Sequence, residues 1–172
     1  MREYLEALTR EQLIDVLEMS AKDVIAMDGV WFQAVEAAEG MDAAMEYDKV
    51  VWKNYARTEG LRLKRVLGLG EHPGLDGLEQ CLRIRYSTLA NATIDIQRDE
   101  DSLTYRIVDC RIQRARERKG MEFHPCKLAG VFEFSELAKS VDSRIVSECI
   151  SCYPDITDKD ACCVWRFTIA QE

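Results

Sequence analysis

The sequence predicts an α+β fold, with N-terminal helices packed on a four-stranded antiparallel β-β-α-β-β sheet. Apolar residues recur at the helical period of about 3.6 residues through the first half of the chain, and near Thr93 the pattern changes to the alternation of strands. The strand-like stretches come in two pairs around one helical stretch, which favours two antiparallel hairpins in one sheet. We expect a single domain over residues 1–172, with a helical part over 1–91 and the β-β-α-β-β part over 92–172.

Three helices are expected in the helical part. The first runs from about 9 to 38, because Thr9 opens a capping box and an apolar stripe follows it. The second runs from about 42 to 67 and ends at a pair of glycines. The third is expected over 76–90, with Asp76 as its cap.

The second half is expected to form four strands and one helix. Strands are predicted over 93–97, 103–113, 143–152 and 161–170. The helix is predicted over 127–140, after a turn that contains a proline.

Composition and charge exclude several classes of protein. The net charge is −8, which argues against a nucleic-acid partner, since affinity for a phosphate backbone comes from clustered Lys and Arg. The basic run 111–119 is the exception, and we interpret it as a strand end and loop exposed to solvent. No apolar run approaches the roughly 20 residues that span a bilayer, and the N-terminus has no apolar signal region. We therefore expect a cytoplasmic protein with no membrane partner.

Four cysteines are candidates for a metal site. Seven cysteines in a reducing compartment favour metal ligation over disulfides. Cys126, Cys149, Cys152 and Cys163 have the spacing C-x22-C-x2-C-x10-C, which predicts one zinc ion held by four thiolates. Four protein ligands leave no open position for water, so this zinc would be structural. Residues 149 and 152 point to opposite faces of a regular strand, so the site requires the strand to end or bulge near Ser151.

Other interpretations of these cysteines stay open. Buried thiols are common small hydrophobic residues in a core. Cys162 could replace Cys163, and His124 or Cys110 could join the site. A reactive dithiol at Cys149 and Cys152 is a third interpretation, although nothing nearby supplies the positive charge that lowers a thiol pKa.

A second group of residues predicts a ligand pocket. Asp28 lies on the apolar stripe of the first helix, one turn before Trp31, while Asp48, Trp52 and Glu59 share a face of the second helix. Buried carboxylates are costly unless they are paired, so these residues are candidates for a polar pocket with the two indoles as its floor. The alternative is that they lie at the edge of the stripe and meet Arg or water. No Ser-His-Asp, Cys-His or HExxH arrangement is evident in the sequence, so acid-base catalysis would fall to the carboxylates.

Several motifs carry a resemblance to known families. The segments Asp28-Gly29-Val30-Trp31-Phe32, His124-Pro125-Cys126, Cys149-x2-Cys152 and Cys163-Val164-Trp165 resemble an uncharacterised prokaryotic domain-of-unknown-function family over nearly the whole chain. More distantly, the order of elements resembles the 4-vinyl-reductase-type small-molecule-binding fold, which is related to the vesicle-tethering Bet3 fold.

The more distant resemblance implies a zinc site and a ligand pocket beside it, between helices and sheet. It places Cys126, Cys149 and Cys152 at the positions of that family's Cys, Glu and Cys ligands. The chain departs from the pattern in having Cys149 where Glu would stand and a longer final turn before Cys163. The cysteine-ended last strand is similar to that of the L-2-amino-thiazoline-4-carboxylic acid hydrolases, which keeps an enzyme among the alternatives.

The sequence as a whole predicts a small-molecule-binding domain with a structural zinc site. We expect a homodimer that holds a small organic molecule between helices and sheet. The alternatives are a small-molecule hydrolase that uses helix carboxylates, and a structural or interaction subunit with no small-molecule role.

Overall fold

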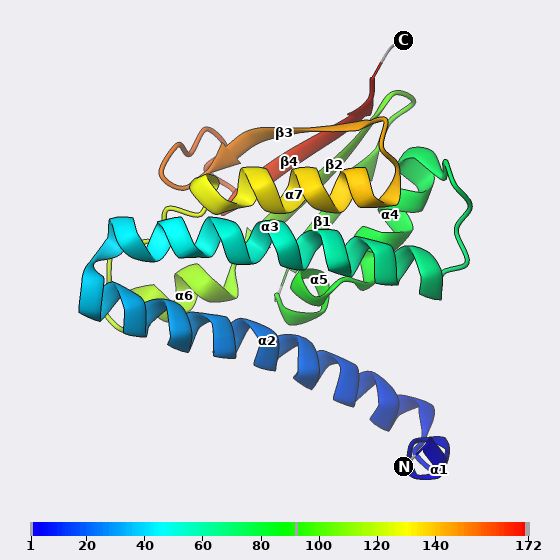
Figure 1. Ribbon diagram of the computed structural model, residues 1–172, viewed down its shortest axis with the longest axis horizontal. Coiled ribbons are helices and arrows are strands. Elements are labelled where there is room, and N and C mark those ends of the chain that lie inside the picture. The colour runs from blue at the N-terminus through cyan, green and yellow to red at the C-terminus, as the bar shows by residue number, and fades with distance from the viewer. Residues whose placement is uncertain (1, 92, 171–172) are drawn as a thin grey trace.

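The computed structural model describes residues 2–91 and 93–170 and has the predicted α+β architecture (Figure 1). The helices are α1 (Arg2–Glu6), α2 (Arg10–Glu39), α3 (Met41–Val66), α4 (Gly74–Ile84), α5 (Tyr86–Ala90), α6 (Arg111–Arg118) and α7 (Lys127–Val141). The strands are β1 (Thr93–Arg98), β2 (Ser102–Asp109), β3 (Ile145–Cys152) and β4 (Cys163–Ile169). They form a four-stranded sheet in the order β1-β2-β4-β3, and every neighbouring pair is antiparallel.

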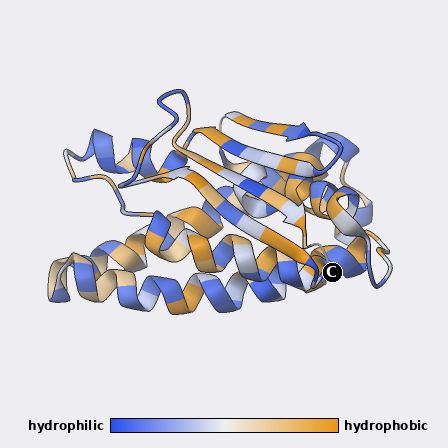
Figure 2. Cartoon of the chain, turned by 90° about the horizontal axis from the view of Figure 1, so that it is seen from above, coloured by the Kyte–Doolittle hydropathy of each residue, from blue (hydrophilic) through white to orange (hydrophobic). Residues whose placement is uncertain are grey.

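The long helices lie on one side of the sheet (Figure 1, Figure 2). Helix α7 covers the sheet, α3 lies alongside α7, and α2 packs against α3 and α5. The central strands β2 and β4 place Tyr105 opposite Trp165, and both rings are fully buried in the main core. The N-terminal end of α2 projects away from this body together with α1 (Figure 1).

Two glycines let α7 approach its neighbours closely. A β-carbon at Gly130 would lie 2.7 Å from the indole ring of Trp165, so only glycine lets α7 sit this close to β4. A β-carbon at Gly60 would collide with the hydroxyl of Ser140 and approach the Leu137 carbonyl oxygen to 3.0 Å. Helix α7 is thus fixed between the sheet and α3.

Helices α2 and α3 begin and end within about one residue of the positions that the sequence predicts, whereas the short helix α1 was not predicted. The Thr9 hydroxyl accepts a hydrogen bond from the Gln12 backbone N–H, and the Gln12 side chain accepts one from the Thr9 N–H. This is the capping box that the sequence predicts.

The prediction of one continuous third helix was wrong. Helix α4 ends at Ile84, Arg85 is extended with φ −68° and ψ 160°, and the short α5 follows. The break turns the side chain of Arg85 into the core, where it is fully buried between two carboxylates.

The basic run was also predicted wrongly, as a strand end and loop. Strand β2 ends at Asp109, and the run folds as the helix α6. Arg, Gln and Glu are good helix formers, and Gln113 and Arg116 give the helix a buried face. Arg116 makes two hydrogen bonds to the Glu36 carboxylate of α2, at 2.7 and 2.8 Å, which hold α6 against α2.

The bulge predicted near Ser151 is confirmed. The register of β3 against β4 shifts between Cys149 and Ser151, so that Cys152 pairs with Cys163. The Ser151 hydroxyl accepts hydrogen bonds from the backbone N–H groups of Thr157 and Asp158 and so anchors the following turn. A search of the described helices finds none whose length and apolar character would suit a membrane span.

Candidate ligand and metal site

The four cysteines predicted as metal ligands gather around Cys152, at the end of β3. The Cys152 thiol lies within hydrogen-bonding reach of the sulfur atoms of Cys126, Cys149 and Cys163. The contacts with Cys149 and Cys163 follow from the bulge in β3 and from its pairing with β4. Cys126, the residue before α7, makes the third contact. We call these four residues the sulfur cluster.

Two nitrogen atoms outside the sulfur cluster contact Cys126. The side-chain amide of Gln113 donates from Nε2 to Cys126 Sγ at 3.2 Å, and His124 Nδ1 lies 3.2 Å from the same sulfur. The Gln113 amide also donates to the His124 carbonyl oxygen and accepts from the His124 backbone N–H, which fixes the Gln113 side chain against the backbone of His124. N–H donors stabilise the charged form of a thiol, which is the form that binds metals.

Other contacts oppose the ionisation of Cys126. The hydrogen bond with Cys152 lowers the pKa of Cys126, but burial and the neighbouring thiols of Cys110 and Cys163 raise it above its usual value. Metal-binding thiols lose their protons as the ion binds, because the ion supplies the compensating charge. The chemistry of the donors therefore fits zinc, which prefers thiolates.

The side chains of the sulfur cluster are not arranged as the ligands of a metal ion. Among the described residues, no three or more His, Cys, Asp or Glu side chains are grouped so that they could hold an ion. The sulfur contacts radiate from Cys152, so its sulfur stands in the middle of the cluster. Tetrahedral coordination would place all four sulfur atoms at about 2.3 Å from a zinc ion between them.

His124 connects the sulfur cluster to a buried carboxyl group. Its Nε2 atom lies 3.6 Å from Oδ2 of Asp48, on the side of the ring away from Cys126. Asp48 Oδ2 is buried and has no hydrogen-bond partner among the described residues. Burial, and next the charge of Arg116, lower the pKa of His124 to about 4, so the ring is neutral near pH 7.

Asp28, Asp48 and Glu133 bring three acids together between α2, α3 and α7. Burial, then the charges of Asp28 and Glu133, raise the pKa of Asp48 to about 8. Burial and then Glu133 raise the pKa of Asp28 to about 6. Buried carboxyl groups whose pKa values are raised toward neutral pH are typical of functional sites.

Glu59 has a different environment from the other predicted carboxylates. Arg85 donates from Nη2 to Glu59 at 2.9 Å and to Glu133 at 2.6 Å, in a region that solvent hardly reaches. The Tyr86 hydroxyl donates to the same Glu133 oxygen. Glu59 is thus part of a buried ion pair that ties α3 and α7 to the α4–α5 break.

A cavity of about 80 Å³ lies between the sulfur cluster and the acids Asp48 and Glu133, and we call it the inner cavity. Its wall includes Asp48, Trp52 and His124 together with Cys126, Cys152 and Cys163 of the sulfur cluster. Trp165 also lines it, and its buried indole N–H, near the sulfur of Cys163, has no hydrogen-bond acceptor among the residues that the structure describes. The inner cavity therefore offers one unpaired acceptor, on Asp48, and one unpaired donor, on Trp165.

The predicted pocket residues are only partly brought together. Asp28, Trp31, Asp48 and Trp52 all lie along the seam between α2 and α3. Trp31, however, is 65% exposed and lines an open groove of about 640 Å³ on the outside of the seam. The aromatic wall of the inner cavity is built instead from Trp52 and Tyr86, whose rings stack at 5.3 Å.

Sequence reasoning missed several residues of the site. Glu133 is an acid inside the apolar pattern of α7, and the same argument that selected Asp28 could have selected it. Gln113 gives no such signal, because the sequence pattern places it in a strand. The sequence indicates a metal ligand or a turn residue at His124, and the contact of His124 with Asp48 joins residues that are far apart in the chain.

The comparisons with known proteins identify a family and nothing beyond it. No curated protein matches the chain, and no solved structure matches it. The likenesses to the 4-vinyl-reductase-type fold and to the thiazoline hydrolases therefore rest on the motifs alone. One family model matches residues 6–169, which is nearly the whole chain. The chain belongs to this family, the family of unknown function DUF6125.

Proposed function

We propose that the chain is a small-molecule-binding domain that holds its ligand in the inner cavity and binds zinc at the sulfur cluster. One observation carries the proposal: the inner cavity is lined by three cysteines of the sulfur cluster and by Asp48 and Trp165, each of which has a buried polar atom with no hydrogen-bond partner in the described part of the chain. Buried polar atoms in folded proteins are nearly always satisfied. A ligand with a donor and an acceptor would satisfy both.

The zinc ion would be structural in this proposal. Cys126, Cys149, Cys152 and Cys163 would hold it, and the ion would join the start of α7 to the β3–β4 hairpin. Gln113 and His124 would orient Cys126, as second-layer partners do in metal sites. The proposal keeps the cytoplasm as the compartment, because all seven cysteines are free thiols.

Elemental analysis of the chain purified without oxygen tests the zinc. We expect about one zinc per chain for a closed four-thiolate site. Less than about half an equivalent of any transition metal would contradict a tight site of this kind. The ligand is tested separately, by denaturing the purified chain and identifying the small molecules that it releases.

A hydrolase is the second candidate, and the raised pKa values of Asp28 and Asp48 favour it. A carboxyl group with a pKa near the working pH can exchange a proton with a bound substrate. Glu59 is a poorer candidate, because its carboxylate is bound to Arg85. Turnover of small cyclic amides by the wild type, lost in Asp48→Asn, would support this function, and equal turnover by both would contradict it.

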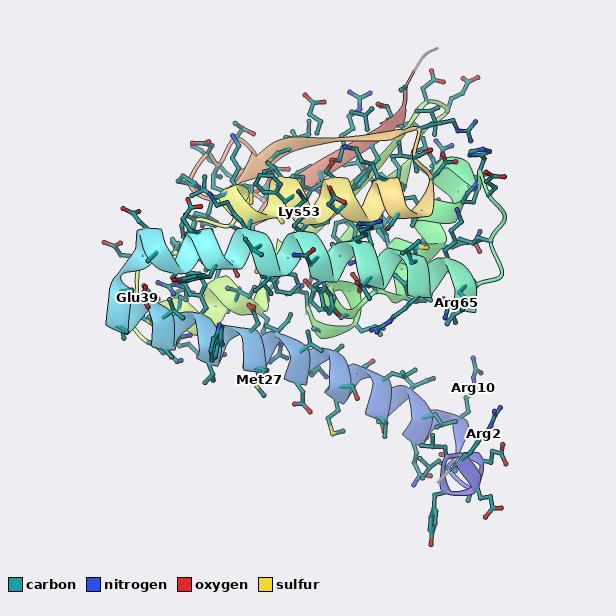
Figure 3. All side chains as sticks on the ribbon, in the orientation of Figure 1. Arg2, Arg10, Met27, Glu39, Lys53 and Arg65 are labelled. Carbon is teal, nitrogen blue, oxygen red and sulfur yellow. The ribbon has the colours of Figure 1, made fainter. Side chains whose placement is uncertain are left out.

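We propose that the exposed apolar side chains of α2 and α3 form the interface of a homodimer. Met27, Val30 and Trp31 are 72%, 68% and 65% exposed, and Val51 of α3 is 45% exposed. Met27 points away from the body of the molecule (Figure 3). A second copy of the chain would cover this surface, and sedimentation of the wild type and of Met27→Glu tests it. Dimers that dissociate in the variant are expected, and a monomeric wild type would contradict the proposal.

A further inference from the structure

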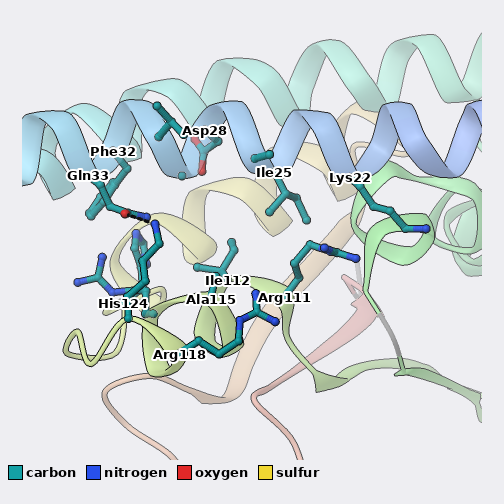
Figure 4. Close-up of a pocket in the computed structure, with 15 residues that line it drawn as sticks. Lys22, Ile25, Asp28, Phe32, Gln33, Arg111, Ile112, Ala115, Arg118 and His124 are labelled. Carbon is teal, nitrogen blue, oxygen red and sulfur yellow. Dashed lines mark hydrogen bonds between the residues drawn. The ribbon is translucent and has the colours of Figure 1, made fainter.

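The basic helix α6 forms one wall of a second pocket, which we call the outer pocket (Figure 4). Its volume is about 270 Å³, and α2 forms the opposite wall. Besides Arg116, four cationic side chains line it: Lys22 from α2, and Arg111, Arg118 and Lys119 at and beyond the two ends of α6. We propose that the outer pocket binds the acidic group of the ligand, so that the ligand of this domain is an organic anion.

The cations of the outer pocket carry charge that the protein leaves largely uncompensated. Arg111 donates to the carbonyl oxygen of Ala90, and Lys119 donates to the side-chain amide of Gln33, both neutral acceptors. Within the described part of the chain, neither pairs with a carboxylate, and the same holds for Arg118. Of these four cations, Lys22 is the one with an acidic partner among the described residues, Glu18, at 3.3 Å on the exposed surface.

Acidic groups at the outer pocket do not cancel this charge. Asp28 supplies the carboxyl group in the wall of the pocket, which is fewer acids than the four cations named above. Burial, and then the charge of Glu133, raise the pKa of Asp28 to about 6. Arg116 also lines the pocket, but its guanidinium is satisfied by Glu36 and adds no net charge. A local excess of positive charge on a chain of net charge −8 attracts small anions to this position.

The outer pocket is continuous in its lining with the inner cavity. Ile25, Ile112 and His124 line both. An anion held by Arg111 and Arg118 would place its apolar part against the two isoleucines and its far end toward His124. The ligand class is therefore a small molecule with an acidic group at one end and an apolar body. This inference rests on the proposed function, because it assigns one end of the same ligand.

Calorimetric titration of the full chain with matched acid and amide pairs tests the inference. The probes are benzoate and benzamide, phenylacetate and phenylacetamide, and hexanoate and hexanamide. The variants are Arg118→Gln and Arg114→Gln, which remove the same charge from exposed positions of the same segment. Arg114 does not line the outer pocket and pairs with Asp109 at 2.9 Å, so Arg114→Gln is the control.

We expect each acid that binds to bind more tightly than its amide. Arg118→Gln should weaken the acids on the order of tenfold, the value of a charged hydrogen bond. It should leave the amides unchanged. Arg114→Gln should change neither by more than about twofold, since an exposed charge away from the site is screened.

Three results would count against the inference. Amides that bind as tightly as their acids would overturn it and leave the proposed ligand function standing. Equal weakening by Arg118→Gln and Arg114→Gln would overturn it too, since the effect would then come from overall charge. If none of the six probes binds, the inference and the proposed ligand function fail together.

Discussion

The imidazole of His124 lies 3.6 Å from the carboxyl group of Asp48. Through this contact the acids between the helices meet the sulfur cluster at the edge of the sheet, because the other nitrogen of His124 lies 3.2 Å from Cys126. Metal, ligand and acid-base chemistry would therefore share one wall of the inner cavity. A substitution of Asp48 is therefore expected to affect the sulfur cluster, and a substitution of Cys126 is expected to affect the acids between the helices.

The buried carboxyl group of Asp48 is expected to make stability depend on pH. Its pKa is raised from 3.8 to about 8, by burial first and then by Asp28 and Glu133. Between these values the folded chain keeps a proton that the unfolded chain releases. Stability is therefore highest on the acidic side of this window and falls as the pH rises toward 8, by at most about 1.4 kcal/mol per pH unit.

Asp48→Asn removes this titration, and urea unfolding between pH 5 and pH 8 measures the effect. The variant should gain stability relative to wild type as the pH rises, by up to about 4 kcal/mol over the range. Curves for the two proteins that stay parallel would show that Asp48 titrates normally in the folded chain.

Arg85→Met should strongly destabilise the fold. Arg85 is fully buried and bonds to Glu59 and Glu133, so its removal leaves two buried acids without their cation. Breaking a buried pair in this way costs about 3–5 kcal/mol. Arg83→Met is the control, because Arg83 pairs with Glu79 on an exposed helix face, where such pairs contribute about 0.5 kcal/mol or less. Equal unfolding free energies for the two variants would refute the role of Arg85.

Cys152→Ser should remove the metal and lower the melting temperature. Cys152 contacts the three other sulfurs of the cluster, and zinc at a hundred times its Kd would stabilise the wild type by about 2.7 kcal/mol. Cys162→Ser is the matched control, because the Cys162 thiol donates to the Val108 carbonyl oxygen instead. The same zinc content and melting curve in both variants would argue against a metal at the sulfur cluster.

Two glycine variants compare a position where α7 packs closely on the sheet with an open position on α2. In Gly130→Ala the new methyl group would meet the Trp165 ring at 2.7 Å, which should destabilise the chain by about 1–3 kcal/mol. In Gly29→Ala the nearest atom is 3.8 Å away, so the better helix former should stabilise α2 by up to about 1 kcal/mol. Chemical unfolding measures both, and a neutral Gly130→Ala would mean that α7 sits further from β4.

Local signals were sufficient for much of the fold. The capping box at Thr9 and the long apolar stripes set the bounds of α2 and α3, and the spacing of Cys149 and Cys152 predicted the bulge that the register shift contains. These features depend on residues that are close in sequence. The two antiparallel hairpins, β1 with β2 and β3 with β4, followed from local pattern for the same reason, whereas the pairing of β2 with β4 joins strands that are far apart in the chain.

The missed features depend on contacts between distant residues. Arg85 interrupts a helical pattern because Glu59 and Glu133 receive its side chain, and these acids lie 26 and 48 residues away. The helix formed by the basic run is held against α2 by Glu36, which binds Arg116 across 80 residues. Nothing in the local pattern of either segment encodes these partners.

Native mass spectrometry of the chain, purified gently and without oxygen, tests the central proposal most directly. We expect the main species to carry one zinc ion and one small organic molecule for each chain that it contains. A main species at the mass of the bare chain would contradict both the structural zinc and the bound ligand.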